Sequence, residues 1–323
     1  KDTAELLIDL SYSAVLGDSD ALAEEVLELE ARMDLLQMQG RMSVLLAARN
    51  PEDAEALAPV LGVIGAAEKV SNATGDIAKI VLEEIGMPAA IRGGLHDATE
   101  TVIRVRADAD APAVGVALGT SHLETETGVR VIAIRRESAV QKQQWLLNPG
   151  AGTTVEADDV LLLRGQDAGL AAAVTAVADA GFTPPARPDG SVPDLERAVD
   201  SIVLMKDMSE LAVDLAYGAV LFDSRPVAEE VSELEVEMDA LKSRLEAWGL
   251  RAAAAVDDPV ELRGLFHLAA ATEVISDAAL EIAEGVLRGI DAHPVVAAAV
   301  QESDEVIVRV VVGETATLAG RSL

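Results

Sequence analysis

The sequence repeats itself over a long span, because residues 206–283 match residues 1–78 at a constant offset of 205 positions. The longest matching run pairs Asp-Leu-Ser-Tyr-Ser-Ala-Val-Leu at 9–16 with Asp-Leu-Ala-Tyr-Gly-Ala-Val-Leu at 214–221. Solenoid repeats are only about 20–50 residues long. A repeat of this size therefore indicates a duplicated domain, and this constrains the fold more than any other feature of the sequence.

The same offset continues beyond the first 78 residues of the repeat. Arg104-Val105 matches Arg309-Val310, and Gly115 matches Gly320. The units therefore follow one another in the order A-B-A-B, and the second B unit stops near its beginning at Leu323. Because a single short strand cannot bury a core, we expect the natural protein to continue with a counterpart of residues 119–181.

Charge excludes two classes of partner. The chain has 56 acidic and 25 basic residues, for a formal net charge of −31. Nucleic acid and anionic lipid both require cationic surfaces, so we expect neither as a partner. An acidic surface of this kind is typical of proteins from a high-salt cytoplasm, where salt screens the self-repulsion.

Features that are missing from the sequence exclude further kinds of site and location. The sequence contains no cysteine, which excludes disulfides, thiolate metal sites and a cysteine nucleophile. No apolar run approaches the ~20 residues that span a bilayer, and nothing resembles a signal peptide. We therefore expect a cytoplasmic protein without direct membrane insertion. The four histidines share no motif, so we predict no catalytic residues.

Apolar residues at helical spacing predict three helices in each A unit. In the first unit the predicted helices are 3–17, about 19–48 and about 51–85. Asp18-Ser19-Asp20 and Asn50-Pro51 have the composition of helix starts. The second unit repeats these signals at Asp223 to Pro226 and at Asp257 to Pro259.

Between the helical units the apolar period changes to two, which predicts strands. The predicted strands are 101–106, 128–136, 144–147 and 159–164, followed by a helix over 166–180. The Pro-rich segment 182–190 predicts a linker.

The B unit resembles the TrkA-C (RCK-C) domain, a regulatory domain of potassium uptake and channel proteins. The resemblance rests on residues 101–106, 115–118, 128–136, 148–149 and 155–165. Asp158-Asp159 stands where that family usually has a Gly-Asp pair. The usual partner domain with a Gly-x-Gly-x-x-Gly fingerprint is absent from the sequence, so we predict no NAD or ATP site.

The A units resemble PhoU, whose fold is two three-helix repeats in one six-helix bundle. The resemblance rests on Glu-x-x-x-Asp steps at Glu30/Asp34, Glu235/Asp239 and Glu273/Asp277, with Glu68/Asn72 as a degenerate fourth step. Together the two resemblances match PhoU/TrkA-C fusion proteins of archaea, which are thought to regulate cation transport. We expect an α+β multidomain protein with PhoU-like repeats at 1–92 and 201–292, a small α/β TrkA-C domain at 98–182, a linker at 183–200, and the start of a second TrkA-C domain at 300–323.

The resemblance to PhoU implies that paired carboxylates bind a divalent metal ion. Residues four apart on a helix lie on one face, and oxygen ligands suit Mg, Ca or Mn better than Zn. The alternative is a solvated acidic face, which is common in so acidic a chain. The candidate metal ligands are Glu30, Asp34, Glu68, Asp76, Glu235, Asp239, Glu273, Asp277 and Glu281.

The resemblance to TrkA-C implies a homodimer, because these domains dimerise, and some bind cyclic di-AMP between protomers. The matching positions are Ile134, Arg135, Arg136, Asn148 and Pro149. Arginine would grip the phosphates bidentately. The alternative is that Arg135-Arg136 only ends a strand.

Three functional hypotheses follow from these observations. The first is a non-enzymatic cytoplasmic regulator of a cation transporter or channel, most directly for potassium, peripheral to the membrane and gated by a small ligand. The second is a PhoU-like metal-binding adaptor in phosphate control, or a regulator of a divalent-cation transporter. The third is a carboxylate-metal hydrolase.

Overall fold

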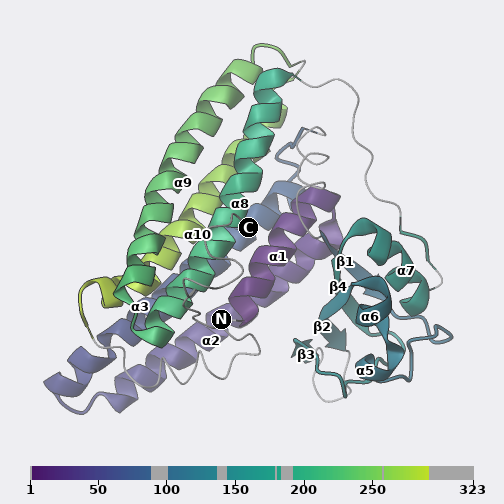
Figure 1. Cartoon of the computed structure of the whole chain (residues 1–323), viewed down its shortest axis with the longest axis horizontal. Coiled ribbons are helices and arrows are strands. Elements are labelled where there is room, and N and C mark those ends of the chain that lie inside the picture. Colours follow the sequence, from purple (N-terminus) through teal and green to yellow (C-terminus); the bar gives the residue numbers. More distant parts are fainter. Residues whose placement is uncertain are drawn as a thin grey trace, which may run out of the picture.

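The structure is a computed structural model, and it describes residues 2–88, 101–136, 144–178, 180–182, 192–256 and 258–290. Figure 1 shows long helices gathered in a bundle, with a small sheet module beside α1. Within the described ranges, no helix combines the length and the apolar character needed to cross a membrane. The second TrkA-C-like segment, predicted at 300–323, lies outside the described residues.

The first helical repeat contains α1 (Asp2–Gly17), α2 (Asp20–Ala47) and α3 (Pro51–Leu82). The predicted start signals act as caps. The Ser19 side chain accepts a hydrogen bond from the Leu22 amide, and the Asn50 side chain accepts one from the Asp53 amide. The three predicted helices are therefore confirmed.

The second helical repeat contains α8 (Pro193–Phe222), α9 (Arg225–Ala252), the 3₁₀ turn η1 (Pro259–Leu262) and α10 (Arg263–Leu287). Residues 193–200, expected to be linker, are instead the first turns of α8, so that prediction was wrong. Proline fits the first turn of a helix, and Leu195 and Ala198 bury this part of α8 in the core.

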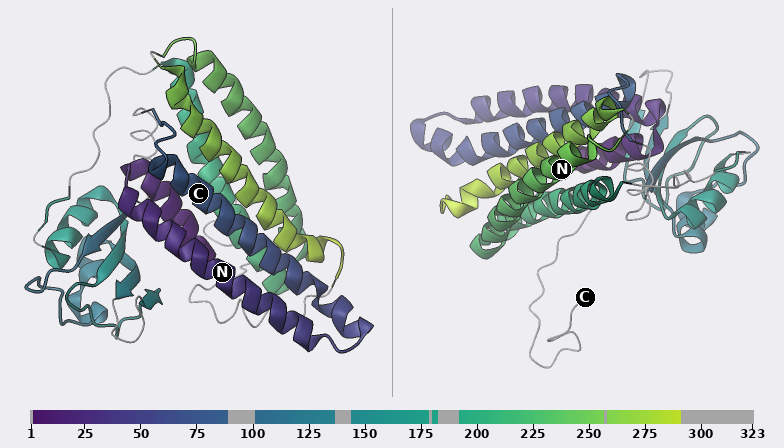
Figure 2. Two further views of the ribbon diagram at one scale, coloured as in Figure 1. Left: turned by 180° about the vertical axis from the view of Figure 1, so that it is seen from behind. Right: turned by 90° about the horizontal axis from the view of Figure 1, so that it is seen from above.

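The two repeats meet through α3 and α10, which pack against each other along the bundle (Figure 2). The core is aliphatic, as the low aromatic content predicts. One buried polar contact also joins the repeats. The Tyr12 hydroxyl of α1 lies 2.6 Å from the Thr272 hydroxyl of α10, and Thr272 donates its own proton to the Leu268 carbonyl at 2.7 Å. Tyr12 is therefore the donor of this contact.

The sheet module, residues 101–178, is a four-stranded antiparallel sheet in the order β1-β4-β2-β3. Its strands are β1 (Thr101–Arg106), β2 (Arg130–Arg136), β3 (Gln144–Leu147) and β4 (Val160–Gly165), and its helices are α5 (Leu118–Ser121), α6 (Leu123–Thr127) and α7 (Asp167–Val177). The four predicted strands and the closing helix are confirmed.

Both faces of this sheet are buried, which fixes the module against the bundle. On one face Leu161 and Leu163 join the core that includes Leu170 and Val174 of α7. On the other face Val102, Ile132 and Leu162 join the core of the helical repeats, and β1 contacts both α1 and α2. The sheet therefore lies between α7 and the first helical repeat.

Candidate functional site

A buried ion cluster joins the sheet module to α2. Glu25 exposes 4% of its side chain, and its Oε1 accepts hydrogen bonds from Arg104 Nε at 3.0 Å and from Arg135 at 3.0 Å (Nε) and 2.7 Å (Nη2). The other oxygen of Glu25, Oε2, is buried without a hydrogen-bond partner. Two arginines of the sheet thus share one carboxylate of the bundle, and such an arrangement resists separation of the two parts.

Two further polar contacts connect α1 to the same sheet. Arg164 of β4 donates to Asp9 of α1 at 2.9 Å, and the Val102 amide of β1 donates to the Ser13 hydroxyl at 3.2 Å. The sheet therefore contacts α1 and α2 through charges as well as through the shared apolar core.

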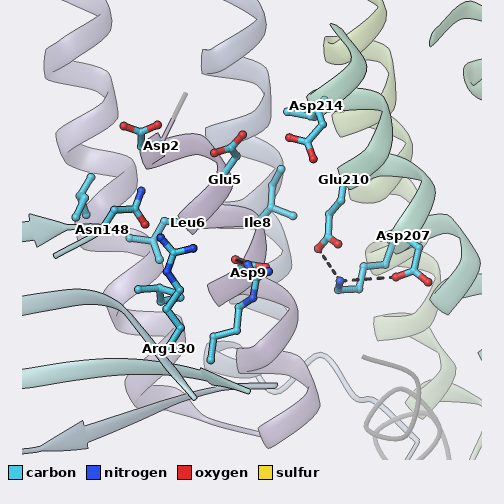
Figure 3. Close-up of a pocket in the computed structure, with 15 residues that line it drawn as sticks. Asp2, Glu5, Leu6, Ile8, Asp9, Arg130, Asn148, Asp207, Glu210 and Asp214 are labelled. Atoms are coloured by element: carbon cyan, nitrogen blue, oxygen red, sulfur yellow. Dashed lines mark hydrogen bonds and ion pairs between the residues drawn. The ribbon is translucent and has the colours of Figure 1, made fainter. Parts of the chain in front are cut away.

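A cavity of about 320 Å³ opens where α1, α8 and the sheet meet. Figure 3 shows Glu5 and Asp9 of α1, Arg130 of β2 and Glu210 of α8 around it. Its lining residues are Asp2, Glu5, Leu6, Ile8, Asp9, Arg130, Ile132, Leu147, Asn148, Arg164, Lys206, Asp207, Glu210, Val213 and Asp214. The cavity therefore touches both helical repeats and the sheet module at once.

Lys206 is the cation on the α8 side of this cavity. Its side chain is 8% exposed, donates to Glu210 at 2.6 Å and lies 3.9 Å from Asp207 (Figure 3). The ammonium group also lies 5.7 Å from the centre of the Tyr12 ring. Burial raises the pKa of Glu210 and of Asp207, while Lys206 opposes the rise. Lys206 therefore favours the ionised forms of Glu210, which is partly buried, and of Asp207, which is half-exposed.

On the α1 side the charges are mostly negative. Burial raises the pKa of the Tyr217 hydroxyl, and the nearby Glu5, Asp2 and Asp214 carboxylates raise it further. Six carboxylates and three basic groups line the whole cavity. A cavity of this composition favours cationic or zwitterionic groups over simple anions.

The five residues predicted to bind cyclic di-AMP do not lie at one site. Ile134 is fully buried in the module core, and Arg135 is engaged by Glu25. Arg136 donates to both carboxylate oxygens of Asp159, at 2.8 and 2.7 Å. Asn148 and Pro149 instead line a second cavity, described next.

This second cavity, of about 430 Å³, belongs to the sheet module. Its lining includes Arg130, His122, Asn148 and Pro149. Arg130 and Asn148 line both cavities, so the two cavities adjoin at this pair. Arg130 is exposed and forms no ion pair with any described residue. Its guanidinium is therefore available to a phosphate in a way that those of Arg135 and Arg136 are not.

The metal candidates of the first repeat gather beside a cation. Burial raises the pKa of Glu30, and Asp34 and Asp76 raise it further, while Lys79 lowers it. The Glu30 carboxylate lies against Gly75 of α3, where a side chain would collide with it. The remaining candidate of this repeat, Glu68, is paired with Arg41.

The metal candidates of the second repeat form a second group. Burial raises the pKa of Asp277, and Glu273 and Asp239 raise it further. The pKa of Glu235 is raised in the same way by burial, Asp239, Asp277 and Glu273. Lys242 pairs with Glu273, and Lys69 pairs with Glu281.

Neither group has the geometry of a metal centre. Among the residues that the structure describes, no three His, Asp or Glu side chains are close enough to hold one ion. Electrostatic repulsion acts over longer distances than metal coordination. The carboxylates of each group can therefore raise one another's pKa values without being close enough to share an ion. Metal binding at these nine residues remains a prediction.

Sequence reasoning missed the residues that join the three parts. Glu25 matches Glu230 in the repeat, but nothing in the sequence indicates that Glu25 is buried and Glu230 exposed. Lys206 was recognised only as the repeat partner of Lys1. The Asp158-Asp159 pair was more informative. Asp159 keeps the aspartate of the Gly-Asp pair usual in the TrkA-C family, and its carboxylate accepts a hydrogen bond from Arg136.

Comparisons with known proteins agree with this architecture. A family model described as the TrkA-C domain matches residues 102–177. A second model, the PhoU domain, matches residues 1–81 and 202–286, which together span just over half of the chain. None of the curated proteins compared with the chain matches it.

Proposed function

Since the chain belongs to the PhoU domain family and carries a TrkA-C domain between its two PhoU repeats, we propose that it is a regulatory subunit of a cation transporter or channel. Both domains are regulatory rather than catalytic, and TrkA-C domains generally regulate transporters and dimerise. The protein would act without catalysing a reaction, on the cytoplasmic side of the membrane, and in a high-salt cytoplasm.

The observation that carries this proposal is the burial of one TrkA-C sheet face against α1 and α2. Val102, Ile132 and Leu162 share a core with the helical repeats, and Glu25 binds two arginines of the sheet. Close-packed interfaces shift between discrete arrangements rather than deform continuously. A ligand that changes the sheet would therefore change the position or stability of the PhoU helices.

The effector we propose is cyclic di-AMP, bound on the sheet module near Asn148 and Pro149. Exposed Arg130 lines the same cavity and supplies a cation for a phosphate. The adjoining cavity reaches Lys206 and Glu210 of α8. A ligand that prefers one arrangement of these groups shifts the population of the whole protein toward it. Potassium is the cation whose transport we propose to be controlled.

A metal-sensing role is the second candidate function. Burial raises the pKa values of Glu30, Glu235 and Asp277, and repulsion from neighbouring carboxylates raises them further. A divalent cation would relieve that repulsion, and oxygen ligands suit Mg²⁺, Ca²⁺ or Mn²⁺. This reading gives a metal-binding adaptor in phosphate control, or a regulator of divalent-cation transport.

Calorimetric titration with cyclic di-AMP in molar KCl tests the first proposal. We expect saturable binding that is lost in Arg130→Ala and kept in Arg32→Ala. Arg32 is an exposed arginine on α2 that lines neither cavity. Absence of binding removes this effector. In that case a rise in melting temperature with Mn²⁺ or Mg²⁺, lost in Asp277→Asn, would support the metal-sensing role.

A further inference from the structure

One charged motif occurs twice in the chain, once in each helical repeat. Residues 1–9 and residues 206–214 both read Lys-Asp-x-x-Glu-Leu-x-x-Asp. Apart from Lys1, which lies outside the described residues, the charged residues of both copies line the cavity where α1, α8 and the sheet meet. We call this cavity the junction cavity. The two repeats therefore present matching charged faces to a single space.

The junction cavity does not depend on how far α1 extends before Asp2. In the second repeat, the part of α8 that precedes Lys206 places its apolar side chains in the bundle core, and none of its residues lines the cavity. The side chains buried there are Leu195, Ala198, Val199, Ile202 and Met205. By analogy with α8, a helical continuation of α1 would lie along the bundle and leave the cavity open.

The helical side of the junction cavity favours a cation. Its lining residues include six carboxylates and only three basic groups. Burial raises the pKa of Glu210 of α8, and Asp9 on α1 raises it further. Burial likewise raises the pKa of Tyr217, and Glu5 and Asp214, from opposite helices, add to this rise. A positive group that enters between α1 and α8 therefore relieves repulsion between the two helices.

Two of the three basic groups bind carboxylates of the repeated motif. Lys206 donates to Glu210 at 2.6 Å, and Arg164 donates to Asp9 at 2.9 Å. The third, Arg130 of β2, is exposed and forms no ion pair with any described residue. A guanidinium binds a carboxylate through two parallel hydrogen bonds. Arg130 is therefore the group of this cavity best placed to accept an anion.

The sheet side of the cavity places an amide with Arg130. Asn148, directly after β3, also lines the cavity, and its backbone amide donates to the Ile132 carbonyl at 2.9 Å. Figure 3 shows Arg130 and Asn148 on the sheet side, and Glu210 and Asp214 on the α8 side. The cavity also has an aliphatic lining, formed by Leu6, Ile8, Ile132, Leu147 and Val213. A matching ligand has an anionic end, an aliphatic stem and a cationic end.

A bare metal ion does not match this lining. In the part of the chain that the structure describes, no three Asp, Glu or His side chains are close enough to hold one ion. A guanidinium or ammonium group carries several N–H donors, so it can bind carboxylates that are too far apart to share an ion. The cavity volume of about 320 Å³ is in the range of pockets for small organic ligands.

We propose that the junction cavity binds a basic amino acid. Its α-carboxylate pairs with Arg130, its stem lies against the aliphatic lining, and its side-chain cation lies among the carboxylates of α1 and α8. Such a ligand touches both helical repeats and the sheet, so it stabilises one arrangement of these three parts. The inference is independent of cyclic di-AMP, which is proposed to bind in the cavity of the sheet module.

Isothermal titration calorimetry of the full chain in molar KCl tests the proposal with three ligands. L-arginine has both charged ends, L-citrulline replaces the guanidinium by a neutral urea group, and agmatine lacks the carboxylate. We expect saturable binding of L-arginine and ~10-fold or more weaker binding of L-citrulline, because hydrogen bonds to charged groups are the strong ones. The screening length at this salt is only ~3 Å, so the difference reports direct contacts.

Arg130→Ala should weaken the binding of L-arginine by ~10-fold or more, but should change that of agmatine by about twofold at most, since agmatine has no carboxylate. Asp214→Asn should weaken both ligands. Its matched control is Asp200→Asn, an exposed aspartate of the same helix that does not line the cavity. This control should change either affinity by about twofold at most.

Four results would overturn the proposal. Two of them concern the unmodified chain, and so hold even if a variant fails to fold: no saturable heat with L-arginine, and L-citrulline binding as tightly as L-arginine. The third is equal weakening by Asp214→Asn and Asp200→Asn. The fourth is equal weakening of L-arginine and agmatine by Arg130→Ala. Binding of L-arginine without any binding of cyclic di-AMP would support this inference and remove only the effector proposed for the sheet module.

Discussion

The Nη2 atom of Arg135 in β2 lies 2.7 Å from the Glu25 carboxylate of α2, and these side chains are only 10% and 4% exposed. Arg104 binds the same carboxylate oxygen. A buried charge that loses its partner costs several kcal/mol. This ion cluster and the shared apolar core hold the TrkA-C sheet and the first PhoU repeat together.

Replacing Glu25 by glutamine should destabilise the protein by about 3–5 kcal/mol, because the two partly buried arginines, Arg104 and Arg135, lose the buried carboxylate that they share. Urea unfolding in molar KCl measures the change. Glu230→Gln is the matched control, since Glu230 is the exposed repeat counterpart and should change stability by less than about 0.5 kcal/mol. Equal effects of the two substitutions would show that the cluster does not stabilise the fold.

Neutralising Glu235 should stabilise the protein at neutral pH. Its pKa is raised by burial and by the carboxylates of Asp239, Asp277 and Glu273, so the folded state holds the proton more tightly than the unfolded state. The resulting stabilisation is fully present below the unfolded pKa and is lost as pH rises through the folded pKa. Glu235→Gln should therefore melt higher than the wild type near pH 7.

Near pH 4 this advantage of Glu235→Gln should disappear, because the wild-type carboxyl is then largely protonated. Glu237→Gln, an exposed position on the same helix, controls for the change in net charge. Thermal melts across this pH range provide the measurement. An advantage of Glu235→Gln that is equal at all pH values, or equal to that of Glu237→Gln, would contradict the assignment.

Lys206→Met should destabilise the protein most at neutral pH. Burial raises the pKa values of Glu210 and Asp207 and Lys206 lowers them, so without Lys206 these pKa values should rise further. Protonation then relieves the repulsion, and the loss of stability should shrink as pH falls. Lys69→Met is the control, because the exposed Lys69–Glu281 pair contributes about 0–1 kcal/mol. A loss that is independent of pH would exclude this role.

Asp158→Gly should stabilise the sheet module. Asp158 has a φ of 66°, in the left-handed region that costs non-glycine residues roughly 1–2 kcal/mol. Its contact with Arg106, at 3.5 Å between largely exposed side chains, offsets little of this cost. We expect a gain of about 1 kcal/mol by urea unfolding. Asp158→Ala keeps the strain and should show no gain, and a gain there would contradict the backbone explanation.

The repeat and the apolar periods were sufficient to predict most of the fold. Helix starts at Ser19 and Asn50, the four strands and the two-repeat bundle depend on local signals that act over a few residues. The linker was misjudged at 193–200 because the Pro-rich composition stops at Pro193, and a proline there starts a helix as readily as it ends a loop.

The candidate site was harder to predict, because it depends on contacts between distant segments. Arg135 has the sequence of a strand end, yet Glu25, 110 residues away in the chain, engages it. Arg130 was recognised as part of a strand but not as a binding residue. Its exposure beside Asn148 appears only when the strands are assembled into the sheet.

Hydrogen exchange on the full chain in molar KCl, with and without cyclic di-AMP, tests the central claim most directly. If the TrkA-C domain and the PhoU repeats act as one regulatory unit, the ligand should change protection in β2 and β3 and also in α1 and α2. Glu25→Gln should remove the changes in the helices while leaving those in the strands. Changes confined to the sheet module, or no change at all, would contradict the account.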